Sequence, residues 1–172
     1  MTAVIKKSLG LIAVVFAIAM TSSVKAEELD LFDLSTPSQK IVINARNRQL
    51  MLVYDDGRVI RYPIAVPKAG KEWFGTTYIA AKFENPDWSP PAEVAADHPE
   101  LPSFIPGGSP RNPMGARALT LEQDQVAIHG TTNKRRGSIG TAASYGCIRM
   151  RNEDVIDLFN RVQVGTLVQM VY

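Results

Sequence analysis

The close spacing of apolar segments in the first half of the chain is the strongest constraint on its fold. Four segments rich in β-branched and aromatic residues are separated only by short turn signals, and they span 40–43, 49–54, 58–66 and 76–83. Asn47 and Asp55-Asp56-Gly57 are typical of hairpin turns. Connections this short leave no room for crossover helices, so the sequence predicts a mainly β domain with antiparallel neighbours. Pro63, inside the third segment, indicates an edge or a bend.

Residues 85–117 interrupt this pattern, because they hold eight of the 11 prolines in the chain. A long segment without regular structure inside a compact domain is typically a lid, a binding loop or disordered. Trp88, Phe104 and Ile105 are apolar and favour an ordered loop packed on the domain. We predict a Pro-rich lid over a functional site, with one helical turn at 93–97. The alternative is an insertion without a role.

One convincing helix is predicted, after residue 151. Asn152 can cap it, and Gly165 ends it. Its apolar positions are spaced as on one helical face and comprise Val155, Ile156, Phe159 and Val162. A short strand at 125–129 precedes the helix, and a last strand at 166–171 follows it.

The N-terminal residues 1–26 have the pattern of a secretory signal peptide. Lys6 and Lys7 precede an unbroken apolar run of 12 residues from Leu9 to Met20, and Val24-Lys25-Ala26 provides small residues for cleavage after Ala26. A membrane anchor is the alternative, but a helix needs about 20 apolar residues to cross a bilayer. We therefore expect an exported, periplasmic protein without stable membrane insertion after cleavage, with a short leader at 27–38 and one domain at 39–172.

Charge argues against a polyanionic partner. The chain has 19 Lys and Arg and 17 Asp and Glu, a net charge of +2. Lys6, Lys7 and Lys25 lie in the predicted signal peptide, which holds no acid, so the remainder carries 16 basic and 17 acidic residues, a net of −1. We therefore expect no nucleic-acid partner.

The single cysteine, Cys147, follows Gly146 and stands two residues before Arg149. An exported chain with one cysteine has no internal disulfide partner for it. His129 lies 18 residues upstream, and a cysteine with a histidine is the minimum pair for thiol nucleophilic catalysis. Arg149 can favour the thiolate. A buried, inert cysteine beside a core histidine is the alternative. Two such ligands fall short of a metal site, so we expect neither metal nor cofactor.

The arrangement around this pair resembles the L,D-transpeptidase (YkuD) family, of the Gram-negative periplasmic type. His129-Gly130-Thr131 is followed by Ser144-x-Gly146-Cys147-Ile148-Arg149-Met150 at the spacing of that family. The resemblance extends over about 39–172. Further similar segments are 86–91, 101–108, 112–117 and 152–155.

This resemblance implies a YkuD-type β-sandwich and a defined reaction. Members of the family attack a peptidoglycan stem tetrapeptide at the L-centre of diaminopimelate, release D-alanine and form a thioester on cysteine. The acyl group then passes to an amine of a second stem peptide, of an outer-membrane protein or lipoprotein, or of a D-amino acid. Carbapenems are expected to acylate the cysteine.

By position, the resemblance makes Cys147 the nucleophile and His129 the base, with the Gly130 carbonyl orienting the imidazole. Backbone N–H groups around Gly146 and Cys147 are expected to hold the oxyanion, and Arg149 to bind a substrate carboxylate. Ser144 and Tyr145 complete the expected substrate-contacting motif.

Tyr145 departs from the family pattern, because many members have histidine there. It can take a hydrogen-bonding or substrate-contact role, or it can only pack. His98 and the basic loop residues are weaker candidates for substrate contact; the latter are Arg111, Lys134, Arg135 and Arg136. Two other functions stay open: a thiol hydrolase acting on stem peptides, and a non-catalytic wall-binding protein.

Overall fold

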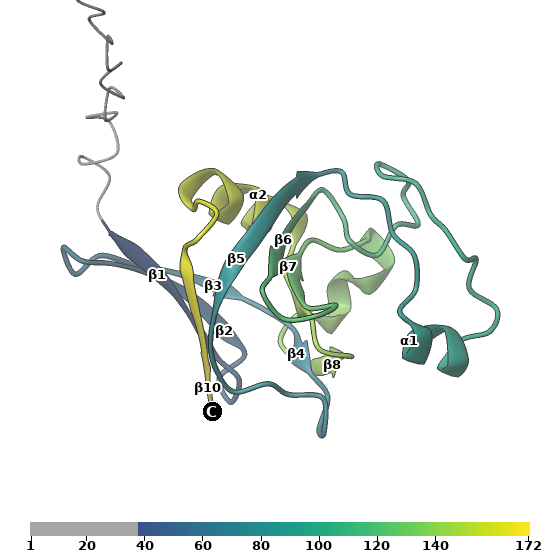
Figure 1. The fold of residues 1–172 in the computed structure, drawn as a ribbon, viewed down its shortest axis with the longest axis horizontal. Helices are drawn as coiled ribbons and strands as arrows, with labels where there is room; N and C mark the ends of the chain where they lie inside the picture. The colour runs from purple at the N-terminus through teal and green to yellow at the C-terminus, as the bar shows by residue number, and fades with distance from the viewer. Residues whose placement is uncertain (1–37) are drawn as a thin grey trace, which may run out of the picture. The chain divides into compact units, whose positions relative to one another are not determined.

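The structure is a computed structural model and describes residues 38–172. The predicted signal peptide, and the predicted leader up to residue 37, lie outside the described residues. An eight-stranded sheet in the order β3-β2-β1-β10-β5-β6-β7-β9 forms the frame, and a two-stranded sheet of β4 and β8 lies beside it (Figure 1). The prediction of a mainly β fold with one principal helix is confirmed.

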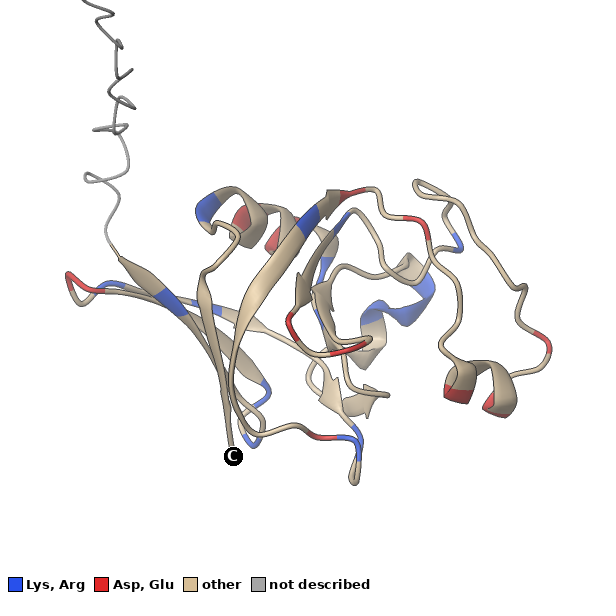
Figure 2. Cartoon of the chain, in the orientation of Figure 1, with Lys and Arg blue, Asp and Glu red and all other residues tan. Residues whose placement is uncertain are grey.

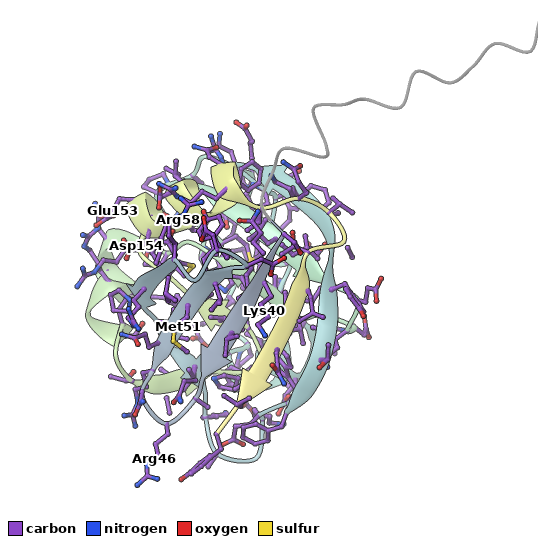
Figure 3. The ribbon with its side chains drawn as sticks, turned by 90° about the vertical axis from the view of Figure 1, so that its left-hand side faces the viewer. Lys40, Arg46, Met51, Arg58, Glu153 and Asp154 are labelled. Carbon is purple, nitrogen blue, oxygen red and sulfur yellow. The ribbon has the colours of Figure 1, made fainter. Side chains whose placement is uncertain are left out.

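The first three strands form the predicted antiparallel meander. They are β1 (Gln39–Asn44), β2 (Gln49–Tyr54) and β3 (Val59–Pro63). Every second side chain points into the core, so that Ile41, Ile43, Leu50 and Leu52 are fully buried. Lys40 and Met51 lie on the opposite side of this part of the sheet (Figure 3).

Strand β5 (Gly75–Glu84) curls the sheet. Its first part pairs antiparallel with β10 (Leu167–Val171), and its second part pairs with β6 (Arg117–Leu121). The register shifts between Ile79 and Ala81, at an irregularity of the kind that bends a strand and increases its twist. The two halves of the sheet therefore face a shared core, beyond which β7 (Ala127–His129) and β9 (Ile148–Arg149) continue the second half.

Not all neighbouring strands are antiparallel, although the sequence had led us to expect antiparallel neighbours. Three pairs are parallel: β1 with β10, β7 with β9, and β4 (Val66–Pro67) with β8 (Ala142–Ser144). The predicted strand 58–66 ends as β3 at Pro63, and β3 lies at the edge of the sheet, as this proline had indicated. The chain then leaves the main sheet and resumes as β4.

The Pro-rich segment is ordered and contains α1 (Ala92–Asp97), one residue longer than the helical turn predicted there. Ile105 is buried and pairs with Trp88 through an isolated bridge, but Phe104 is 52% exposed, so its predicted role as an anchor is wrong. The segment ends where β6 begins, a strand that the sequence analysis missed.

Helix α2 (Asn152–Arg161) packs against β6 and β7. Val155, Leu158 and Phe159 are its buried positions, and Val162, directly after the helix, is buried as well, so that the four follow the i, i+3, i+4, i+7 spacing. Leu158 therefore takes the place predicted for Ile156, which is only half-buried. Within residues 38–172, helices are too short or too polar to cross a membrane.

Lys82 of β5 joins the sheet to the end of α2. Its ammonium group donates to the carbonyl oxygens of Phe159, at 2.7 Å, and Val162, at 2.6 Å, and lies 4.4 Å from the centre of the Phe159 ring. These carbonyls belong to the last turn of α2, where partners within the helix are missing. A cation is favourable at this end of the helix dipole.

We predict that Lys82→Met lowers the free energy of unfolding by about 1–3 kcal/mol, because two helix-end carbonyls lose a charged donor. The measurement is urea denaturation followed by circular dichroism. Lys40→Met is the matched control, since Lys40 is an exposed lysine on the neighbouring part of the sheet. Equal losses in the two variants would exclude this capping role.

Candidate active site

The parallel pairing of β7 and β9 brings His129 and Cys147 to the same place. His129 is the last residue of β7, and Cys147 immediately precedes β9. The register pairs Ile128 with Ile148 and His129 with Arg149. Both side chains line a cavity of about 310 Å³, together with Ser144, Tyr145 and Arg149. The structure therefore brings the predicted site residues together at the edge of the sheet.

The turn that carries Cys147 is held by two side chains. Ser144 Oγ donates to the carbonyl oxygen of Cys147, and Trp73 Nε1 donates to that of Gly146 at 2.9 Å. Gly146 has a φ of 138°, a region that favours glycine. The sequence analysis did not single out Trp73, because its partner is 73 residues away along the chain.

The thiol of Cys147 is partly exposed, and its Sγ lies 3.6 Å from the carbonyl oxygen of Gln125. Burial raises the pKa of Cys147, while the Ala127 backbone and the Arg149 charge lower that pKa by less. Desolvation disfavours the charged form, and here it outweighs the predicted effect of Arg149. At neutral pH the resting cysteine is therefore the protonated thiol.

His129 is 5% exposed, and its Nδ1 lies 2.7 Å from the carbonyl oxygen of Gly130. A carbonyl oxygen only accepts, so Nδ1 carries the proton and Nε2 keeps its lone pair. Burial first, and then the charge of Arg149, lower the pKa of His129 to about 4, although the carbonyls of Gly130 and Pro113 partly offset them. The imidazole is therefore neutral at neutral pH, and the lone pair of Nε2 is free to accept a proton.

Arg149 is a buried cation facing the cavity, with 8% of its surface exposed. Its Nη1 donates to Ser138 Oγ at 2.8 Å, and its backbone pairs with Ala65. Its buried Nε finds no hydrogen-bond partner, and no carboxylate of residues 38–172 forms an ion pair with it. An anionic group of a ligand would satisfy this side chain.

Of the weaker basic candidates, only Arg135 lines the cavity. It belongs to a 3₁₀ helix, Asn133–Ser138, which also carries Arg136. Arg136 forms an ion pair with Glu153 of α2, outside the cavity. His98 lines the cavity as well, at the end of α1.

Asn152 was predicted to cap α2, and that prediction is wrong. Arg151 occupies the capping position without a side-chain cap bond. The Asn152 Oδ1 atom instead accepts from the N–H groups of Ala116 and Thr131, both at 3.1 Å. It thus ties the end of the Pro-rich segment to the residues after His129. A Cβ on Gly130 would lie 2.2 Å from this oxygen, so the site requires glycine there.

Cys147 also lines a second cavity, of about 810 Å³. Trp88, Pro91 and Met114 of the Pro-rich segment border both cavities. The second one has two acidic residues, Glu122 and Asp124, in the connection between β6 and β7, whereas the first has Arg135 and Arg149 together with the acidic Glu93. The thiol can therefore be approached from two sides, one lined by charges of both signs and the other by acidic charges alone.

No group of three or more His, Cys, Asp or Glu side chains that could hold a metal ion occurs within the described range. Without a metal ion, these residues can perform nucleophilic chemistry. They provide a thiol, a neutral imidazole base, a backbone carbonyl that orients the imidazole, and a cation.

We predict that His129 titrates near pH 4 in the folded protein. Because the unfolded chain protonates near 6.5 and the folded chain does not, the free energy of unfolding should fall as the pH drops from about 6.5 to 4, by about 3 kcal/mol in total. NMR titration of the imidazole gives the pKa, and urea denaturation at several pH values gives the free energy. A His129 pKa of 6 or more would contradict the prediction.

Comparison with known proteins agrees with this geometry. Residues 38–170 match the model of the YkuD L,D-transpeptidase catalytic domain. The chain is 40% identical over 146 residues to the probable L,D-transpeptidase YbiS of Escherichia coli, an alignment covering 79% of this chain and 45% of YbiS. It is 37% identical over 145 residues to the probable L,D-transpeptidase ErfK/SrfK of E. coli, with the same coverages. The chain thus spans about half the length of these curated relatives.

Among solved structures, an L,D-transpeptidase from Mycobacterium smegmatis superposes with a TM-score of 0.62 at 18% identity, covering 79% of this chain and 59% of that one. The L,D-transpeptidase LdtMt1 in complex with imipenem superposes with a TM-score of 0.59 at 15% identity, covering 78% and 59%. These two similarities concern the fold. The family match and the curated relatives together establish that the chain belongs to the YkuD family of L,D-transpeptidase catalytic domains.

Proposed function

We propose that this protein is a periplasmic, cysteine-dependent L,D-transpeptidase that acts on peptidoglycan stem peptides. The observation that carries the proposal is the pairing of a protonated thiol, Cys147, with a buried neutral imidazole, His129, in one cavity. Family membership and the relatives named as probable L,D-transpeptidases support the reaction class. Export rests on the predicted signal peptide at 1–26.

The first step is acylation. Nε2 of His129 removes the proton of Cys147 as Sγ attacks the carbonyl carbon at the L-centre of diaminopimelate. The backbone N–H groups around Gly146 and Cys147 stabilise the oxyanion. The bond to D-alanine breaks, and the imidazolium returns its proton to the leaving amine, which leaves a thioester. General-base catalysis fits better than a resting thiolate–imidazolium pair, because burial disfavours both charged forms.

The second step transfers the acyl group. An amine attacks the thioester carbon and gives a proton to His129, the C–S bond breaks, and the thiolate takes the proton back. Arg149, which lines the first cavity, binds a carboxylate of the donor there. The acceptor enters through the second cavity as an ammonium group, which Glu122 and Asp124 attract, and it loses one proton to solvent before the free amine attacks. A stem peptide, an outer-membrane protein or lipoprotein, or a D-amino acid can supply that amine.

Two cavities that meet at one thiol favour transfer over hydrolysis. Water needs no binding site, because it is abundant, whereas a transferase must orient a second substrate and exclude water. The hydrolase is nevertheless the second candidate function, since the same thioester can react with water.

Cys147→Ala is predicted to abolish turnover of a diaminopimelate tetrapeptide, because the acyl acceptor is lost. His129→Ala is predicted to lower turnover about 10²- to 10⁴-fold, the usual contribution of general acid–base catalysis. Mass spectrometry of the products measures both effects. Acylation by a carbapenem, followed as a mass increase of the protein, should slow in His129→Ala in parallel with turnover. Cys147→Ser should be as inactive as Cys147→Ala, since a hydroxyl has a far higher pKa than a thiol. Wild-type turnover by Cys147→Ala would contradict the mechanism.

Removing the acidic charges of the second cavity tests the assignment of the acceptor. The double substitution Glu122→Gln with Asp124→Asn is predicted to shift the product ratio from transfer product towards free tripeptide, with the rate of D-alanine release less affected. Mass spectrometry with a saturating amine acceptor gives this ratio. Asp55→Asn, on an exposed hairpin, is the matched control. Free tripeptide as the sole product of the unaltered protein would instead assign the chain as a hydrolase.

A further inference from the structure

Helix α1 lacks the apolar packing that holds the other elements of the fold. It has six residues, none of them buried, and Pro91 at its N-terminal end provides no side-chain cap. A helix this short is not stable by itself. Yet Glu93, Val94 and His98 form part of the wall of the first cavity. The position of this wall must therefore depend on polar contacts.

Those contacts converge on Tyr145. Its hydroxyl donates to Asp97 Oδ2 at 2.7 Å. Lys68 Nζ lies 3.5 Å from the centre of the Tyr145 ring and 4.0 Å from Asp97 Oδ2. The ring edge of His98 completes the group, with centroids 6.4 Å apart. We call Tyr145, Asp97 and Lys68 the latch.

A second ion pair supports the latch. Lys71 contacts Glu93, so both acidic residues of α1 pair with lysines of the β4–β5 connection. Acidic residues are the only charged ones in α1 (Figure 2). The helix lies on the Pro-rich loop, on the side of the molecule where β4 and β8 are found (Figure 1). Opposite charges therefore hold α1 against the connection that follows β4.

The contacts that hold α1 are exposed and polar, whereas the core is held by buried apolar side chains. The side chains of Lys68 and Asp97 are 40% and 50% exposed. Exposed ion pairs and single hydrogen bonds contribute little each, so the closed position of α1 is reversible. Tyr145 is the member that stands in the cysteine motif, two residues before the nucleophile.

We propose that Tyr145 is a positioning residue that holds α1 closed over the first cavity and thereby determines how tightly a stem peptide is retained. Its hydroxyl acts through Asp97 and not on the reacting atoms. The identity of the substrate rests on the function proposed above, whereas the latch itself does not.

The test is Tyr145→Phe, which removes the hydroxyl and keeps the ring beneath Lys68. Tyr62→Phe is the matched control, because Tyr62 also donates to a carboxylate, Asp157, at 2.7 Å, on another part of the domain. Hydrogen exchange of residues 92–98, measured by mass spectrometry, should become about two- to tenfold faster in Tyr145→Phe and stay unchanged in Tyr62→Phe. Unchanged exchange in Tyr145→Phe would overturn the proposal.

The substitution Asp97→Ala tests whether the Tyr145 hydroxyl acts through this carboxylate. If the hydroxyl acts through Asp97, then adding Tyr145→Phe to Asp97→Ala should produce no further acceleration of exchange. A full additional effect would mean that Tyr145 acts on α1 by another route, and would overturn the latch.

Kinetics separates positioning from a direct catalytic role. In Tyr145→Phe, KM for the tetrapeptide should rise about two- to tenfold. The rate of Cys147 alkylation by iodoacetamide should stay within about twofold, because this small reagent also reaches the thiol through the second cavity. A parallel loss of alkylation would show that Tyr145 acts on the thiol, and would overturn the proposal. Hydrogen exchange and alkylation do not require peptidoglycan activity, so they test the latch even if the proposed function fails.

Discussion

The parallel pairing of β7 with β9 is the interaction on which the site depends. It places the end of one strand and the start of another in one register, with His129 opposite Arg149. Two strands that run in the same direction need a long connection, and here that connection carries the 3₁₀ helix with Arg135 and the short strand β8. Helix α2 then packs behind β7, and Asn152 fastens the backbone after His129. The geometry of the candidate site is therefore a consequence of sheet topology.

Burial determines the protonation state of the candidate catalytic pair. It lowers the pKa of His129, where it outweighs the hydrogen bonds to the Gly130 and Pro113 carbonyls, and it raises the pKa of Cys147, where it outweighs the charge of Arg149. The charge of Arg149 lowers the pKa of both residues, since a cation disfavours the imidazolium and favours the thiolate. A neutral pair has no charge to desolvate at rest, and in the proposed reaction the charged pair forms only as the thiol attacks. Gly130 supplies a carbonyl in the place where other Cys–His sites use an amide or carboxylate side chain.

The two sides of the first cavity are held by different forces. The wall formed by β7 and β9 rests on a core of fully buried side chains such as Ile128, Ile148 and Met150. The opposite wall, α1, rests on exposed ion pairs and one tyrosine hydroxyl. A rigid wall suits residues that must keep a fixed geometry for chemistry. A weakly held wall suits a lid that must admit and release a peptide.

The sequence by itself determined the strands of the meander, the C-terminal helix, and the pairing of Cys147 with His129 in one motif. These features depend on local alternation, turn residues and short spacings. Other features arise only when distant segments meet: Trp73 bonds to Gly146 across 73 positions, and Tyr145 bonds to Asp97 across 48. Asn152 had the local signature of a helix cap, but its amide oxygen is held by Ala116 and Thr131 in the folded chain. Local sequence fixes backbone conformation, whereas the partner of a polar side chain is fixed by whichever unsatisfied backbone group the tertiary fold brings beside it.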